Sequence, residues 1–133
     1  MILIDASVFL SDLSVKDVHH EKAVKLFEEL RNGKYGEYFT SDYIFNEVVG
    51  VTFSKVGKER SVEVGDYIKS SMFILNIDQQ LLDGAWIFFE KTPFTLNFVD
   101  YTSIVACQLL NNPTILTFDK EFLKVKGITI ISS

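Results

Sequence analysis

The chain has 133 residues, a net charge of −5 and an apolar fraction of 47%, which suit one domain with a well-filled core and leave no room for a second of ordinary size. No apolar run approaches the roughly 18–20 residues that a membrane span needs, and residues 1–5 lack the basic start of a signal peptide. The net negative charge argues against a protein that attracts nucleic acid through its overall electrostatic field, unless some of the acids gather in one pocket where cations neutralise them. We therefore expect one domain over residues 1–133, in the cytoplasm, with no membrane partner.

The predicted elements are delimited by caps and breakers. In chain order they are a strand over 2–4, a helix over 19–30, a strand over 38–40, helices over 42–56 and 59–71, a strand over 73–77, helices over 79–91 and 97–110, a strand over 114–117, a helical turn over 119–123 and a strand over 127–131. Ser41 or Asp42 can cap the helix that Gly57 ends, and Asp78 can cap the helix that Pro93 follows. A turn is expected at 111–113, where Asn-Asn-Pro stands.

Strands and helices therefore alternate with short connections, which predicts an α/β sandwich around a mainly parallel sheet. Crossovers between parallel strands are almost always right-handed. In open sheets of this kind, ligands bind beyond the carboxyl ends of the strands, near the point where the strand order reverses.

Four acids fall near that edge of the predicted sheet. Asp5 directly follows the first strand, and Asp119 follows the strand over 114–117. Asp100 lies in the first turn of its helix, and Glu47 lies about one turn into the helix after the second strand. Because a helix that follows a strand starts at the same edge, we expect these side chains to border one pocket.

Like charges at this spacing require a counter-ion. Two bare carboxylates about 4 Å apart repel by roughly 4 kcal/mol at an effective dielectric near 20. Oxygen ligands suit Mg²⁺ or Mn²⁺, which lower the pKa of a bound water and stabilise charge on a phosphate. Zinc fits poorly, because Cys107 stands alone and His19 and His20 are adjacent. Cys107 lies in an apolar stretch and is interpreted as a buried core residue that fits a reducing compartment.

Each acid also has a structural interpretation. Asp5 can cap a turn after its strand, and Asp119 can cap the helical turn that follows it. Asn97 and Asp100 have the spacing of a capping box. Glu47 has apolar neighbours, so its side of the helix is expected to be buried. Capping does not explain why all four acids should meet at one edge of the sheet.

Several motifs follow one another in a familiar order. They are Asp5-Ala6-Ser7-Val8-Phe9-Leu10 after an apolar strand, His20-x-x-Ala23, Glu47 in the helix after the second strand, Asn97-Phe98-Val99-Asp100-Tyr101, Leu116-Thr117-Phe118-Asp119-Lys120-Glu121-Phe122, and Lys126-Gly127-Ile128. Over essentially the whole chain, this series resembles PIN domains, the fold of VapC-type toxins. Asn97 stands where many relatives have Ser or Thr, a change that is compatible with capping.

The resemblance implies a three-layer fold and a metal-dependent ribonuclease. It makes Asp5, Glu47, Asp100 and Asp119 the catalytic and metal-binding acids for Mg²⁺ or Mn²⁺. It gives weaker supporting roles to Ser7 and Thr117, and Glu121 is a further acid with a weaker claim. It also implies hydrolysis of an RNA substrate, a homodimer and, for toxins, a small antitoxin protein as partner.

Two surfaces are candidates for contacts with partners. The helices over 79–91 and 43–56 carry more apolar residues than one core face needs, which favours a dimer or a partner groove, although burial within the monomer would also explain them. Basic residues form two groups in the sequence, Lys55, Lys58 and Arg60 near a helix junction and Lys120, Lys124 and Lys126 after Asp119. The second group is close enough to the expected pocket to meet phosphates, and a solvated face is the alternative.

Other functions compatible with these residues differ in chemistry. A catalytically inactive PIN-like module would dock to RNA or protein, and magnesium binding would distinguish it. A receiver-like signalling domain normally has a pair of acids after its first strand, where this chain has Asp5 alone. A DNase or flap-type nuclease would use the same ions on a DNA backbone.

Overall fold

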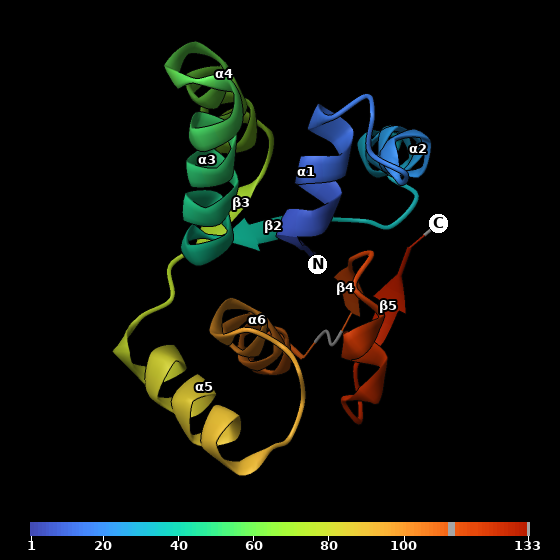
Figure 1. The fold of residues 1–133 in the computed structure, drawn as a ribbon. Helices are drawn as coiled ribbons and strands as arrows, with labels where there is room; N and C mark the ends of the chain where they lie inside the picture. The colour runs from blue at the N-terminus through green and yellow to red at the C-terminus, as the bar shows by residue number, and fades with distance from the viewer. Residues whose placement is uncertain (112–113, 133) are drawn as a thin grey trace.

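Five short strands form one parallel sheet in the order β3-β2-β1-β4-β5 in the computed structural model of the protein, which describes residues 1–111 and 114–132 (Figure 1). The strands are β1 (Ile2–Ile4), β2 (Tyr38–Ser41), β3 (Phe73–Leu75), β4 (Thr114–Leu116) and β5 (Thr129–Ile131). The helices are α1 (Ala6–Leu13), α2 (His20–Arg31), α3 (Asp42–Val56), α4 (Lys58–Ser71), α5 (Gln79–Lys91), α6 (Phe98–Leu109) and the 3₁₀ helix η1 (Lys120–Lys124).

Helices cover both faces of this sheet. Figure 1 shows α1 to α4 on one side and α5 with α6 on the other. Strand β1 is central and apolar on both faces, since Ile2, Leu3 and Ile4 are all buried. The predicted three-layer α/β architecture is therefore confirmed, and the strands are all parallel.

The strand order reverses at β1. From β1 the chain adds β2 and then β3 outward, and it returns to place β4 on the other side of β1. Leu3 pairs with Ile115 and Ile4 pairs with Leu116, so Asp5 and Thr117 leave the sheet side by side. The carboxyl ends of β1 and β4 thus flank the position where parallel sheets bind ligands.

One helix was missing from the sequence prediction. Residues 6–13 form α1, where only a turn after Asp5 was expected. The helix packs against both α2 and α3, and it buries Ala6, Val8, Phe9 and Ser11. The helix has only eight residues, which is too short a run for apolar periodicity to identify a helix.

The other elements lie where the sequence places them, with shifts of one or two residues at their ends. The predicted caps are present as well: Ser41 Oγ accepts from the Ile44 N–H at 3.1 Å, and Asp78 Oδ1 accepts from the Leu81 N–H at 2.9 Å. Gly57 ends α3 with a φ of 94°, which favours glycine. The predicted turn at 111–113 falls mostly on residues 112–113, outside the described residues.

Cys107 is fully buried in α6, as expected for a core residue. Burial raises the pKa of its thiol to about 12, so it stays protonated near neutral pH. Among the described residues, no helix has both the length and the apolar character to cross a bilayer.

The Ser41 cap should contribute measurably to stability, because it satisfies a buried helix N–H at the start of α3. Replacing Ser41 by Ala should lower the free energy of unfolding by about 0.5–2 kcal/mol. Denaturant unfolding of the two proteins measures this change. Ser54→Ala, at an exposed position of the same helix, is the matched control; an equal effect of the two substitutions would contradict a capping role.

Candidate active site

Asp5 lies at the carboxyl end of β1 and is only 5% exposed. Two hydroxyl groups donate to one oxygen of its carboxylate. Thr117 Oγ1 lies 2.7 Å and Ser7 Oγ lies 2.9 Å from Asp5 Oδ2. Asp5 is the N-cap residue of α1, but these bonds connect its side chain to the segment after β4. The orientation of this carboxylate is therefore determined by tertiary contacts with Thr117.

The same two hydroxyls hold the segment that carries Asp119. Thr117 Oγ1 accepts from the Asp119 N–H at 3.0 Å, and Ser7 Oγ accepts from the Phe118 N–H at 3.1 Å. The hydroxyl oxygens themselves are 3.3 Å apart. Ser7 and Thr117 thus join the start of α1 to the chain beyond β4, and their supporting role at a metal site stays a prediction.

Asp119 and Asp100 both use one oxygen in a helix cap. Asp119 Oδ1 accepts from the Glu121 N–H at 3.0 Å at the start of η1. Asp100 Oδ2 accepts from the Asn97 N–H at 3.0 Å, while Asn97 Oδ1 accepts from the Asp100 N–H at 2.9 Å. The predicted capping interactions of Asp119 and of the Asn97–Asp100 box are therefore confirmed. Each cap occupies one carboxylate oxygen, so capping does not prevent the other oxygen from binding an ion.

Glu47 is half-buried on α3 and close enough to Asp5 to affect its own ionisation. Burial raises the pKa of Glu47, and the negative charge of Asp5 raises it further. Burial also raises the pKa of Asp5, against the hydrogen bonds from Thr117 and Ser7. Both carboxylates are thus less easily ionised than a carboxylate in water.

Asp100 responds to all three of the other acids. Burial raises the pKa of Asp100 to about 7, the charges of Asp5, Asp119 and Glu47 add to this rise, and the hydrogen bond from Asn97 opposes it. Asp100 is only 7% exposed. The carboxylates of the other three predicted acids thus lie near enough to Asp100 to affect its ionisation.

This region lacks a protein counter-charge. The ion pairs found in the described part of the chain join Lys34 to Glu29, Arg60 to Glu63 and Lys124 to Glu121, and none reaches Asp5, Glu47, Asp100 or Asp119. Partly buried carboxylates without a cation are unstable when ionised. A divalent ion with a preference for oxygen would remove this instability, so the donor set fits Mg²⁺ or Mn²⁺.

The side chains do not converge on one point as they stand. Within residues 1–111 and 114–132, no three acidic, histidine or cysteine side chains form a group that could hold an ion. Hydrogen bonds hold Asp100 and Asp119 in their caps and Asp5 against hydroxyls. Binding of one ion by several of these acids therefore requires their side chains to move toward it.

The remaining candidate ligands lie elsewhere. Glu121 Oε2 accepts from Thr95 Oγ1 at 2.5 Å, and Glu121 Oε1 pairs with Lys124 at 2.9 Å, so this acid is already partnered. His20 Nδ1 lies 2.9 Å from the Ser11 carbonyl oxygen. The His19 ring stacks on Phe118, with centroids 4.6 Å apart. No sequence spacing indicated the Thr95–Glu121 contact or the His19–Phe118 stack, because both join segments far apart in the chain.

Known proteins with related sequences share this architecture. A VapC ribonuclease of Archaeoglobus fulgidus is 26% identical over 106 residues, which cover 78% of this chain and 66% of that protein. The match thus spans just under two thirds of the length of this curated relative. The sarcin-ricin loop cleaving toxin VapC20 of Mycobacterium tuberculosis is similar over 100% of both chains, with a TM-score of 0.87 and 19% identity.

A toxin–antitoxin complex from Klebsiella pneumoniae contains a further similar chain, with a TM-score of 0.69 and 18% identity over 99% of this chain and 97% of that one. At these identities, the structural likenesses establish the fold alone. The PIN domain family model matches residues 2–128, which is nearly the whole sequence. With this match and the three-layer fold, the chain belongs to the PIN domain family.

Proposed function

We propose that this protein is a divalent-metal-dependent endoribonuclease that hydrolyses RNA phosphodiester bonds. The observation that carries the proposal is the group of four acids at the reversal point of the sheet, with no paired cation in the described structure. Relatives that are named as a VapC ribonuclease and as a sarcin-ricin loop cleaving toxin support RNA as the substrate. The same ions would also serve a DNase, which remains the nearest enzymatic alternative.

Asp5, Glu47, Asp100 and Asp119 would hold the ions. Bound Mg²⁺ or Mn²⁺ supplies positive charge beside the scissile phosphate and lowers the pKa of a water. Thr117 and Ser7 orient the Asp5 carboxylate through one oxygen, and the Asn97 cap orients Asp100 through one oxygen. The side chains of the protein would thus supply pre-organised oxygen ligands in a partly buried site, where interactions between charges are stronger than in water.

Substitution of the acids should abolish cleavage and keep the fold. Asp5→Asn and Asp100→Asn retain the size and one hydrogen-bond acceptor of each side chain but remove the charge that an ion needs. We expect RNA cleavage at background level, measured by electrophoresis of a labelled RNA, with native circular dichroism. Glu121→Gln is the matched control, because Glu121 is held by Thr95 and Lys124. Full activity of either Asn variant would contradict the metal role.

The raised pKa of Asp100 predicts how stability depends on pH. The folded protein holds this proton up to about pH 7, whereas the unfolded chain releases it near the ordinary pKa of 3.8. The contribution of the proton to stability is therefore fully present below pH 3.8 and is lost as the pH rises through 7. In EDTA, the melting temperature of the wild type should therefore fall relative to that of Asp100→Asn as the pH rises from about 4 to 7, the interval between the two pKa values, and should level off above it.

The same experiment tests ion binding. At pH 8, addition of Mn²⁺ should raise the melting temperature of the wild type, because the ion binds only the ionised carboxylates. The Asp100→Asn protein should respond less. Parallel pH profiles for the two proteins in EDTA, or equal responses to Mn²⁺, would exclude Asp100 as the titrating ligand. An absent response in the wild type, together with absent cleavage, would instead favour an inactive PIN-like binding module.

We also propose that the protein forms a homodimer through α5. This helix buries Leu81 and Ala85 against the rest of the chain, while Trp86 and Ile87 are each 51% exposed. Phe89 and Phe98 pack against Trp86 and extend the apolar surface. Large aromatic residues on an otherwise polar surface are typical of interfaces, and a second copy would cover them symmetrically.

A charge at the centre of this surface should separate the subunits. Ile87→Asp should shift the protein from dimer to monomer in sedimentation velocity experiments, with little change in the circular dichroism spectrum. Phe53→Asp, at an exposed position of α3, tests the other helix that the sequence singled out. Dissociation by the Phe53 substitution alone would place the interface on α3, and a monomeric wild type would refute the dimer.

A small antitoxin protein is the expected partner if the chain is the toxin of a toxin–antitoxin pair. The likeness to a chain in the Klebsiella pneumoniae toxin–antitoxin complex supports this proposal. A short reading frame beside the gene that encodes a protein with a DNA-binding half would identify the partner.

A further inference from the structure

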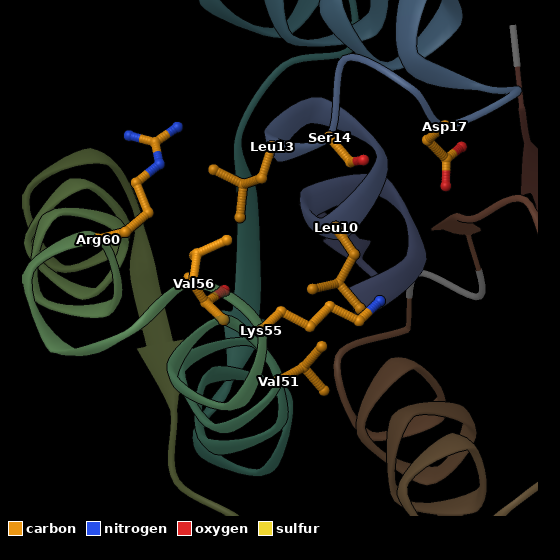
Figure 2. Close-up of a pocket in the computed structure, with 9 residues that line it drawn as sticks. Leu10, Leu13, Ser14, Asp17, Val51, Lys55, Val56 and Arg60 are labelled. Carbon is orange, nitrogen blue, oxygen red and sulfur yellow. The ribbon is translucent and has the colours of Figure 1, made fainter.

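A groove of about 450 Å³ opens between α1, α3 and the start of α4 (Figure 2). Leu10 and Leu13 line it from α1, and Val51 and Val56 line it from α3. Its volume lies within the roughly 300–1,000 Å³ that is usual for small-ligand sites. The groove is thus large enough for a flat ring and is mostly apolar on its walls.

The groove adjoins the candidate active site along two helices. Glu47, Val51 and Lys55 are spaced four residues apart and therefore share one side of α3. Leu10 lies one turn beyond Ser7 on α1, and α1 packs against α3. Lys55 is about 12 Å from Glu47 along the helix axis, at 1.5 Å per residue. A chain molecule that has one unit at the acids can therefore place a neighbouring unit in the groove.

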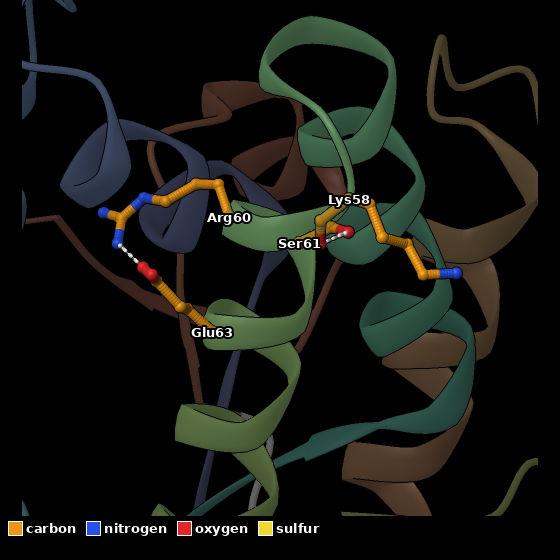
Figure 3. A network of polar contacts seen from close by, with 4 residues as sticks. All are labelled: Lys58, Arg60, Ser61 and Glu63. Atoms are coloured by element: carbon orange, nitrogen blue, oxygen red, sulfur yellow. Dashed lines mark hydrogen bonds and ion pairs between the residues drawn. The ribbon is translucent and has the colours of Figure 1, made fainter.

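A basic side chain lies across this groove. In Figure 2, the extended side chain of Lys55 crosses from α3 toward Leu10 on α1. Lys55 is exposed, and it is absent from the ion pairs found among the described residues. Arg60 borders the groove from α4, where its guanidinium donates to Glu63 at 2.8 Å (Figure 3).

The basic residues near the α3–α4 junction, Lys55, Lys58 and Arg60, have different surroundings. Lys55 and Arg60 both line the groove. Lys58 points away from Arg60 in Figure 3, and its Nζ lies 6.0 Å from the centre of the Phe53 ring. Of the three basic residues that the sequence grouped together, Lys55 is thus the one that lines the groove and is absent from the ion pairs found among the described residues.

We propose that this groove binds an unpaired nucleotide of the RNA substrate, with its base against Leu10 and Val51 and an adjacent phosphate against Lys55. The inference rests on the proposed ribonuclease function and adds a binding site outside the four acids. Asp17 also lines the groove, and its carboxylate offers an acceptor for an amino group on the base edge. Lys55 supplies local positive charge at the groove in a protein of net charge −5.

The geometry favours an unpaired nucleotide over a duplex. Within a double helix, each base face is covered by its stacked neighbours, so only an unpaired base can lay its face on leucine and valine side chains. A protein segment made only of apolar residues would also fit the walls, but it would leave the Lys55 charge without a partner, whereas each nucleotide carries a phosphate. The open lysine charge and the continuity with the acids therefore favour RNA.

Fluorescence anisotropy tests this proposal. The experiment measures binding of a short fluorescein-labelled single-stranded RNA in EDTA, over a range of salt concentrations. Lys55→Gln should weaken binding several-fold and reduce the slope of log K against log salt by about 0.7, the value for one phosphate contact on a single strand. Val51→Gln should weaken binding without changing that slope. In Mn²⁺, Lys55→Gln should raise KM for cleavage and leave kcat unchanged, because the contact lies away from the scissile bond.

Charge-matched controls separate the groove from general electrostatics. Lys22→Gln, on the exposed side of α2, changes charge equally and should leave binding unaffected. Glu63→Gln should tighten binding because it frees Arg60, whereas Glu28→Gln, also on α2, should not. Thermal melting of each variant confirms that it is folded. A duplex RNA of the same sequence should compete more weakly than the single strand.

Distinct results separate this inference from the proposed function. If the wild type cleaves RNA and Lys55→Gln behaves like Lys22→Gln in both binding and KM, the groove is no nucleotide site and the nuclease proposal stands. Equal competition by duplex and single strand would overturn the preference for an unpaired nucleotide. A wild type that neither binds nor cleaves RNA would refute both proposals.

Discussion

The pairing of β1 with β4 determines where Asp5, Thr117 and Asp119 lie in the candidate active site. With Ile4 opposite Leu116, the next residues are Asp5 and Thr117, and a 2.7 Å hydrogen bond joins their side chains across 112 residues of sequence. Thr117 in turn accepts from the Asp119 N–H, so a second acid is positioned by the same hydroxyl. A shift of one residue in this pairing would turn Asp5 and Thr117 to opposite faces and dismantle the site.

The site gathers negative charge that the protein does not balance by itself. Burial and the neighbouring acids raise the pKa of Asp100 to about 7, and the charge of Asp5 adds to the raised pKa of Glu47. This crowding of carboxylates lowers the stability of the fold. Proteins retain such groups where a bound cation or a reaction needs them. The hydrogen bonds of the caps and hydroxyls hold one oxygen of each aspartate and leave the other available, so the same residues serve the fold and the proposed chemistry.

For the proposed cleavage of RNA, a protein of net charge −5 needs positive charge close to the bound phosphates. In this chain Lys124, five residues after Asp119, is paired with Glu121, whereas Lys55 lines the groove between α1 and α3 and is absent from the ion pairs found among the described residues. From these positions we infer that bound ions and Lys55 would act on different phosphates. Divalent ions would neutralise the phosphate at the acids, and Lys55 would neutralise a neighbouring phosphate over the groove.

Sequence alone was sufficient for the alternation of elements, the parallel sheet and most caps, because these depend on local periodicity. The rule that parallel strands end at one edge led to the four acids, and their role as metal ligands stays a prediction. The sequence did not reveal α1, since a helix of eight residues is too short for its apolar periodicity to be recognised. It grouped Lys55, Lys58 and Arg60, and only packing separated them, because neighbours in sequence point in different directions on a helix. The Thr117–Asp5 bond, the Thr95–Glu121 contact and the groove likewise join segments that are distant in the chain, so they exist only once the sheet and its helices have assembled.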